Sequence, residues 1–205
     1  MIDQDELTQE EMLAAVTDAA LYRVRTHLPA QVVSVDLDRN TVDVQPLVMG
    51  FKDGIGYRNL PVIKEVPIKY YGAGGFVVTF QPAVGDVCEL AIHDRSIDTW
   101  KRTGGIVEPE RRHRHDLTDA TAYFGLNDYA NSVPSIQSGM DIRSKDGNTG
   151  VRITGSSIEF RQSGTVIATM SASGVTFNVP VEIQGRDFLT HTHPGDSGGN
   201  TGPVN

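Results

Sequence analysis

Residues 8–27 follow the apolar pattern of an amphipathic helix. The apolar positions, mostly three or four residues apart, are Met12, Val16, Ala19, Ala20 and Val24. Thr8 and Glu11 have the spacing of a capping box, in which each side chain accepts a hydrogen bond from the other residue's backbone N–H. Pro29 cannot continue a helix, so we expect the helix to end before it. We interpret this helix as a lid on the following domain; the alternative is a docking helix for a partner.

From Gln31 the apolar period changes to two, which is typical of β-strands. The alternating positions are Val33, Val35, Leu37, Val42 and Val44, with a turn at residues 38–40, and they predict a β-hairpin. Further short runs predict strands at Leu60–Val62, Val66–Tyr70, Phe76–Phe80 and Val87–Ile92. Gly72, Gly74 and Gly75 supply turn dihedrals that other residues resist. Short antiparallel strands without a helical pattern between them favour a small barrel or sandwich.

After an irregular polar stretch at residues 127–138, where we place a domain boundary, the chain continues as short β-runs between glycine turns. The apolar positions of these runs are Met140, Ile142, Val151, Ile153, Ile158, Phe160, Val166, Ile167, Val175, Phe177, Val179, Val181 and Ile183. The last run, Val175 to Ile183, alternates without interruption. On the opposite face of all these strands we expect small polar residues. The whole β-patterned segment, residues 139–187, is short and has one apolar stripe, so it cannot form a stable core alone. Three copies wound about a common axis can bury every stripe.

Charge and composition restrict the class of protein. The formal charge is −8, and the first 20 residues hold six acids and no Lys or Arg. This balance argues against nucleic-acid binding, which depends on neutralising phosphates. No apolar run is long enough to span a bilayer, and the first residues are acidic where a signal peptide is basic, so we expect synthesis in the cytoplasm without a signal peptide. The single cysteine, Cys88, alternates with Leu90 and Ile92, which indicates a buried strand thiol.

Several spaced elements within residues 30–126 resemble a known family when taken together. They are the run from Leu60 to Phe80 with its glycine turn, the Gly85-Asp86 turn, the segment Asp94–Trp100, and the run from Arg111 to Leu126. In this order they resemble the N-terminal OB-fold domain of the central spike proteins of contractile-tail bacteriophages. Trp100, the only tryptophan, is expected to anchor the closing edge of that barrel.

The resemblance implies an all-β fold in five parts. These are an N-terminal helix (1–29), an OB-fold domain (30–126), a linker (127–138), an intertwined trimeric β-helix shaft (139–187) and an apex (188–205). It also implies a structural role, as a membrane-piercing spike in the virion. Such a spike is a homotrimer attached to the hub protein at the distal end of the tail baseplate, and it perforates the outer membrane of the host. We expect neither an enzyme nor a nucleic-acid partner.

His191 and His193 are the predicted metal ligands. In an extended strand, residues i and i+2 point to the same side, so both imidazoles can reach one ion. One chain supplies two nitrogens, and three chains on a three-fold axis supply six. Six imidazole nitrogens are compatible with iron or nickel, whereas zinc usually prefers four ligands. The resemblance implies iron, because the tip of the family's spikes binds iron through a His-x-His motif, and we predict one metal ion per trimer.

A second His-x-His motif, His113 to His115, serves as a control. Arg111, Arg112 and Arg114 surround it, and their positive charge opposes a bound cation. We interpret this segment as a solvated basic connector, with contact to an acidic partner as the lesser alternative.

Two motifs that resemble enzyme sites carry less weight. His191 and His193 also resemble the start of the metallo-β-lactamase motif His-x-His-x-Asp-His, but Asp196 lies one position too far along and no histidine follows it. Residues 195–199 spell the serine-protease run GDSGG, yet the chain lacks the surrounding double barrel, so we interpret them as turns. The alternatives to a spike are an OB-fold binding module for oligosaccharide or single-stranded nucleic acid and, less favoured, a metal-dependent hydrolase.

Overall fold

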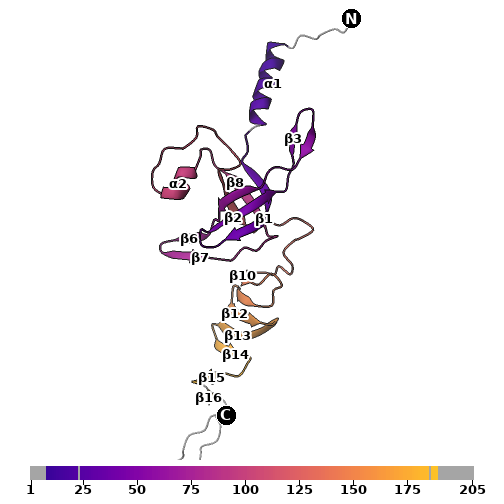
Figure 1. Ribbon diagram of the computed structural model, residues 1–205. Helices are drawn as coiled ribbons and strands as arrows, with labels where there is room; N and C mark the ends of the chain where they lie inside the picture. The colour runs from indigo at the N-terminus through magenta and orange to yellow at the C-terminus, as the bar shows by residue number, and fades with distance from the viewer. Residues whose placement is uncertain (1–7, 23, 185, 189–205) are drawn as a thin grey trace, which may run out of the picture. The chain divides into compact units, whose positions relative to one another are not determined.

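The computed structural model describes residues 8–22, 24–184 and 186–188 (Figure 1). The chain divides into two compact units, Met1–Asp128 and Tyr129–Asn205, which we call unit 1 and unit 2. Strands predominate, which confirms the predicted all-β class. The helices of the described residues are α1 (Gln9–Leu21) and α2 (Asp98–Thr103), and neither is long and apolar enough to cross a membrane.

Helix α1 begins at a closed capping box, as its spacing predicted. The backbone N–H of Glu11 donates to Thr8 Oγ1 at 3.3 Å, and the backbone N–H of Thr8 donates to the Glu11 carboxylate at 2.8 Å. The helix ends at Leu21, earlier than the predicted end at residue 27. Residue 27 is instead the first residue of strand β1 (His27–Asp36). Every residue from Thr8 to Tyr22 is exposed, so α1 covers no core and the lid interpretation is wrong.

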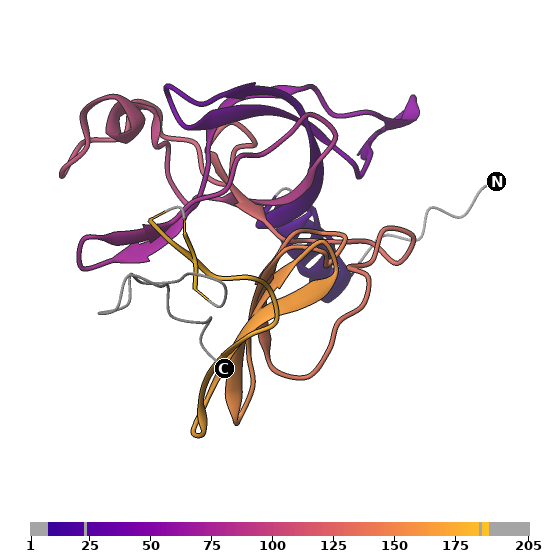
Figure 2. The ribbon, with the colours of Figure 1, turned by 90° about the horizontal axis from the view of Figure 1, so that it is seen from below.

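Five strands of unit 1 form an antiparallel sheet that curls towards a barrel. They are β1, β2 (Thr41–Pro46), β5 (Ile63–Pro67), β8 (Val87–Ile92) and β9 (Ala120–Phe124), in the order β5-β2-β1-β8-β9. Figure 2 shows the strands of this unit curving around a common centre. The two edges of the sheet meet where Ile68 forms a parallel bridge with Ala122, and the N–H of Lys69 donates to the Ala122 carbonyl at 2.9 Å. This closure agrees with a five-stranded, partly open barrel.

The core of unit 1 lies inside the curled sheet. Its buried apolar residues are Ala30, Val32, Val42, Val44, Ile63, Val66, Ile68, Cys88, Leu90, Ile92, Ala120 and Ala122. The alternation predicted in β2 and β8 is confirmed. In β1 the prediction holds for Val35, which packs against the core, but fails for Val33, which is exposed while Val32 is buried. The pairing of β1 with β2 shifts between Val32 and Ser34. An extra residue at such a bulge changes the face to which the following side chains point.

Two other expectations about unit 1 are wrong, and one strand was missed. Trp100 lies in α2 and is half exposed, so it does not anchor the closing edge. The sequence pattern missed β9, which begins with the small residues of Ala120-Thr-Ala and therefore carries a weak strand signal. The two strands predicted between residues 60 and 70 are one strand, β5, which begins after Pro61 because proline cannot donate to a ladder.

Two short hairpins complete the strands of unit 1. Strand β3 (Gly50–Lys52) pairs with β4 (Gly56–Arg58), and β6 (Tyr71–Ala73) pairs with β7 (Phe76–Val78). Gly74 and Gly75 form the β6–β7 turn with φ angles of +60° and +86°, which confirms their predicted role. Gly72 lies within β6 instead, where a Cβ atom would come 2.6 Å from the carbonyl oxygen of Phe76.

Unit 2 is built on an antiparallel sheet in which each strand pairs with the next in sequence. Its strands are β10 (Met140–Arg143), β11 (Gly150–Ile153), β12 (Ser157–Gln162), β13 (Thr165–Ser171) and β14 (Gly174–Phe177). They coincide with the predicted β-runs. A two-stranded ladder of β15 (Glu182–Ile183) and β16 (Arg186–Asp187) follows. The intertwined β-helix predicted for residues 139–187 requires three chains and stays a prediction.

The uninterrupted alternation over residues 175–183 predicts one continuous strand, but the structure has two separate strands there. Strand β14 ends at Phe177 and β15 begins at Glu182. Between them, the N–H of Asn178 donates back to a carbonyl of β13 at 2.9 Å. Pro180 has no N–H to offer a ladder. The bond of Asn178 is thus the last one to β13, and the chain leaves the sheet before Pro180 although its apolar period continues.

Candidate interaction surface

The sheet of unit 2 places its apolar and polar side chains on opposite faces. One apolar row across the five strands consists of Met140, Ile153, Ile158, Met170 and Val175, and the second consists of Ile142, Val151, Phe160, Ala168 and Phe177. Paired residues of neighbouring strands point to the same side, so the two rows form one surface, which we call the apolar face. This is the candidate interaction surface of the protein.

Much of the apolar face is open to solvent in a single chain. Ile142 is 66% exposed and Phe177 is 56% exposed, and no described residue of unit 2 is buried. Complete burial of one such side chain contributes about 1.5–3 kcal/mol, so the sheet forgoes much of its potential stability while this face is in water. A contiguous exposed apolar surface of this kind is typical of a binding surface.

A hollow of about 560 Å³ lies within the apolar face. Phe160, Met170 and Val175 of the two rows line it, together with Val179 and Val181 from the segment after β14. Its lining is predominantly apolar side chains, and its size is within the range of sites that take up a ligand or the side chains of another surface. The segment after β14 thus extends the apolar face beyond the strands.

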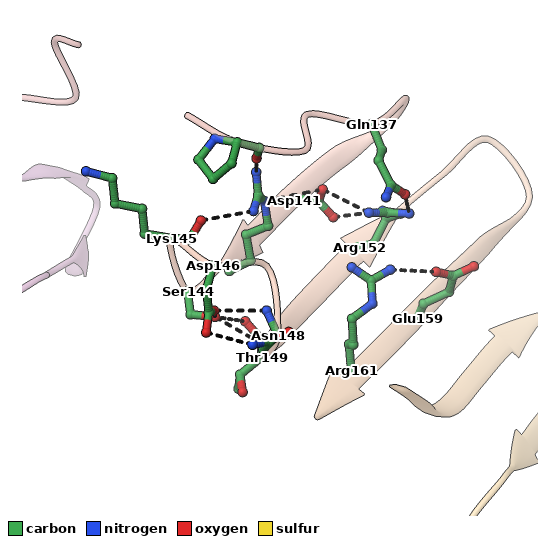
Figure 3. Close-up of polar contacts among 12 residues, drawn as sticks. Gln137, Asp141, Ser144, Lys145, Asp146, Asn148, Thr149, Arg152, Glu159 and Arg161 are labelled. Atoms are coloured by element: carbon green, nitrogen blue, oxygen red, sulfur yellow. Dashed lines mark hydrogen bonds and ion pairs between the residues drawn. The ribbon is translucent and has the colours of Figure 1, made fainter. Parts of the chain in front are cut away.

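The opposite face carries a ladder of charged residues (Figure 3). Arg152 Nε donates to Asp141 Oδ1 at 2.8 Å and Arg152 Nη2 donates to Asp141 Oδ2 at 3.2 Å, while Arg143 Nε lies 3.7 Å from Asp141 Oδ2. On the next strand, Arg161 lies 3.6 Å from Glu159. The hydrogen bonds from Arg152 hold the pKa of Asp141 below its usual value. The two-pronged Asp141–Arg152 pair favours one register of β10 against β11.

The size of these side chains corrects the expectation of small polar residues on this face. The side chains of Arg143 and Arg152 are only 11% exposed, because they lie flat across the sheet and contact their neighbours. The signal was present in the sequence, where Asp141 stands between two residues of the apolar rows. Since long charged side chains already cover the polar face, the apolar face is the side that lacks a cover.

The same arginines hold the segment that precedes β10. Arg143 Nη2 donates to the carbonyl oxygen of Pro134 at 2.6 Å, and Arg152 Nη1 donates to the side-chain oxygen of Gln137. Both bonds join residues of unit 2 (Figure 3). The irregular segment at 134–137 is therefore tied to the sheet of unit 2.

The predicted metal ligands, His191 and His193, lie outside the described residues. The last described strand, β16, ends at Asp187, shortly before them. A donor set made of imidazoles suits a transition metal such as iron or nickel, whereas magnesium and calcium prefer oxygen ligands.

The second His-x-His motif lies in unit 1 and is not a solvated connector, so that interpretation is wrong. His113 Nε2 lies 2.9 Å from Oδ2 of the buried Asp119, and Oδ1 of Asp119 accepts a hydrogen bond from the Ile97 N–H at 2.9 Å. His115 Nδ1 lies 3.0 Å from the carbonyl oxygen of Arg25. His113 therefore holds the connection between β8 and β9 together internally, and His115 ties this connection to the segment that precedes β1.

His113, Asp116 and Asp119 form a compact group in the described part of the chain, with their donor atoms within 4.8 Å of one another. These donors already have partners within the protein. Asp119 bonds to His113, and Asp116 accepts hydrogen bonds from the N–H and hydroxyl of Thr118, which lower the pKa of its carboxyl. The hydrogen bonds account for the group, and it is not evidence of iron.

Cys88 is buried in β8, as its alternation predicted. Burial raises the pKa of its thiol to about 11. A thiol with so high a pKa is protonated near neutral pH and reacts slowly. Cys88 is a core residue of unit 1.

Residues 28–125 match the family described as the phage protein Gp138 N-terminal domain. This range contains the curled sheet of unit 1 and nearly coincides with residues 30–126, which carry the resemblance to phage spikes. The match supports a phage structural protein that is associated with the virion. No curated protein matches the chain. The apolar face of unit 2 lies outside the matched residues.

Proposed function

We propose that the protein is the central spike of a contractile phage tail or a related injection machine. In this proposal it is a homotrimer whose unit 1 attaches to the baseplate hub and whose unit 2 forms the shaft that perforates the host outer envelope. The Gp138 match of residues 28–125 supports the phage assignment. The observation that carries the proposal is the exposed apolar face of unit 2.

A sheet with one covered polar face and one open apolar face is half of a hydrophobic core, and a stable layer must cover the other half. Three copies about one axis would turn all three apolar faces inward. The ladder around Asp141 and Arg152 would then remain on the outside, where its charges stay near water. Closed rotational symmetry lets identical surfaces cover each other without leaving one exposed.

The apex completes the proposal. His191 and His193 from three chains would give six imidazole nitrogens around one iron ion. Separated chains cannot complete this ligand shell, so metal binding would stabilise the assembled state. This is a mechanical function, in which the ion fastens the three chain ends together during piercing, and it needs no catalytic residue.

The mass of the full-length protein in solution tests the assembly. Light scattering is expected to give three times the 22.3 kDa of one chain. A mass of one chain at micromolar concentration would contradict the trimer and with it the shaft.

Elemental analysis tests the apex separately. We expect about one iron ion per three chains, and loss of the metal in the double variant His191→Ala, His193→Ala, with the trimer retained because the apolar faces still meet. The matched control is His27→Ala, which removes an exposed imidazole from unit 1. Metal that survives the double substitution would move the site elsewhere in the chain.

A further inference from the structure

A hollow of about 730 Å³ lies on the surface of unit 1. Strands β2 and β5 bound it through Thr41 and Lys64, the β1–β2 turn through Arg39, and the connection between β8 and β9 through Trp100 and Arg111. Strands β2 and β5 are the second and third strands of the curled sheet in chain order. In partly open five-stranded barrels, the face of these two strands and the first and last connections bind oligosaccharides or oligonucleotides.

The hollow is positively charged although the chain as a whole is negative. Its basic residues are Arg39, Lys64, Lys101, Arg102 and Arg111, and its acidic residues are Glu65 and Asp98. The ion pairs at the hollow are Arg39–Glu65 at 2.5 Å, Lys101–Asp98 at 3.4 Å and Arg102–Glu110 at 2.6 Å. Lys64 and Arg111 are exposed, and neither belongs to an ion pair within 4 Å among the described residues. Besides the hydrogen bonds of Thr118, the charge of Arg111 lowers the pKa of Asp116. The side chains of Lys64 and Arg111 are both accessible to an anionic group.

Trp100 adds an apolar surface to this charged site. It is the only tryptophan of the chain, lines the hollow and is half exposed. A large ring with an apolar body and a polar N–H is typical of binding surfaces. Beside it, the carboxylates of Glu65 and Asp98 and the hydroxyl of Thr41 can accept hydrogen bonds. The hollow therefore combines a flat ring, exposed cations and acceptors for hydroxyl groups.

We propose that this hollow binds an oligosaccharide that carries a phosphate or carboxylate group. Trp100 stacks against a sugar ring, Lys64 and Arg111 hold the anionic group, and the carboxylates accept hydrogen bonds from sugar hydroxyls. The volume falls within the range of about 300–1,000 Å³ that is usual for ligand sites. This saccharide site goes beyond the structural function of a spike and does not depend on the trimer.

Single-stranded nucleic acid fits the hollow less well. Such sites stack successive bases on several aromatic rings along a basic groove. Among the described residues that line this hollow, Trp100 is the only aromatic one. Glu65 and Asp98 would also face a continuous row of phosphates, and the net charge of −8 opposes the approach of a polyanion. A sugar chain with an isolated anionic group avoids both penalties.

Fluorescence of Trp100 provides a direct test, because no other tryptophan contributes to the signal. The full-length protein is titrated with maltotriose that carries one phosphate ester, with unmodified maltotriose and with an oligothymidylate of four nucleotides. We expect a saturable change with the phosphorylated sugar and an affinity about tenfold or more above that of the other two, since the charge-assisted bonds require the phosphate.

Two double variants assign the binding to the hollow. Lys64→Gln with Arg111→Gln is expected to weaken binding of the phosphorylated sugar about tenfold or more. Lys52→Gln with Arg58→Gln removes the same charge from the exposed β3–β4 hairpin and is expected to leave binding unchanged. Both pairs are exposed, and circular dichroism verifies that both variants fold. Equal affinity for the two sugars, no binding of either, tighter binding of oligothymidylate, or full binding by the Lys64/Arg111 variant would overturn the proposal.

Discussion

The two units are made of similar strands, but only unit 1 encloses a core. Its sheet curls until Ile68 meets Ala122, and Leu90 and Val44 inside it are completely buried. In unit 2 every strand pairs with its neighbour in sequence, and Phe177 on the apolar face remains 56% exposed. Alternation of apolar and polar residues thus creates an apolar face, but a core forms only where the sheet closes or another surface covers it.

The sheet that closes has more shifts of strand register than the sheet that stays open. In unit 1 the register shifts in two adjacent strand pairs, β1–β2 and β2–β5. In the sheet of unit 2 it shifts in one pair, β12–β13. Bulges bend a strand and increase its twist, so two of them on neighbouring pairs favour the curvature by which a sheet closes.

The largest expected effect comes from a charge on the apolar face. Phe177→Asp should abolish assembly of the full-length chain, because three unpaired carboxylates would be buried at the proposed interface. Sedimentation or light scattering measures the loss, and the fold of unit 1 should persist by circular dichroism. Thr176→Asp is the matched control, since its side chain lies on the opposite face of the same strand. An assembled Phe177→Asp protein would show that this face is not the contact.

A substitution in the core of unit 1 should lower the stability of this unit whether or not the chains assemble. Leu90→Ala removes a completely buried side chain and is expected to lower the free energy of unfolding of unit 1 by about 2–5 kcal/mol. Urea unfolding followed by Trp100 fluorescence measures it at several protein concentrations. Val84→Ala, at an exposed position, should change stability little. An unfolding midpoint of the Leu90 variant that rises with protein concentration would mean that unit 1 also depends on a partner.

Gly150 tests how tightly the strands of unit 2 approach each other. A Cβ atom there would lie 2.5 Å from the carbonyl oxygen of Ile142, so Gly150→Ala should destabilise unit 2 by about 1–3 kcal/mol as the strands move apart. Gly155→Ala is the matched control, because no atom lies within 4 Å of its added Cβ. Thermal unfolding compares the two variants. Equal stability would show that β10 and β11 can separate without cost.

The smallest expected effect concerns pH. Because the hydrogen bonds of Arg152 lower the pKa of Asp141 in the folded state, the pair stabilises unit 2 above the unfolded pKa of about 3.9. That stability is lost as the pH falls through the lower, folded pKa. Asp141→Asn should therefore be less stable than the original protein at pH 7 and lose less on acidification. Thermal unfolding is measured at pH 7 and at an acidic pH below the folded pKa of Asp141. Glu182→Gln, at an exposed carboxylate, serves as the control at both pH values. Parallel acid sensitivity of the two variants would contradict the role of the pair.

Most strands could be predicted from the sequence, because their signals are local. The alternation Cys88, Leu90, Ile92 identified β8, and the glycine turns separated the strands of unit 2. The failures have physical causes that alternation does not carry. The bulge after Val32 turned Val33 away from the face predicted for it, and β14 ends at Phe177 within an unbroken apolar period that leads to Pro180.

One of the two candidate sites could be predicted from the sequence and the other could not. The apolar residues of unit 2 were identified from their period, and their exposure depends only on how one sheet is laid out. The saccharide hollow could not be found in this manner, because Arg39, Lys64, Trp100 and Arg111 are distant in sequence. Trp100 was assigned to the closing edge of the barrel for the same reason, since nothing in its own segment shows what lies across from it.

The all-β class, the capping box of α1, the turns and the two-faced strands follow from the amino-acid order alone, since each depends on residues a few positions apart. Long-range packing was needed to establish which sheet closes, that His113 is held by the buried Asp119, and that the basic residues of unit 1 gather around Trp100. These features depend on contacts between remote segments. Such contacts follow from the curvature and register of the whole sheet, which no single segment encodes.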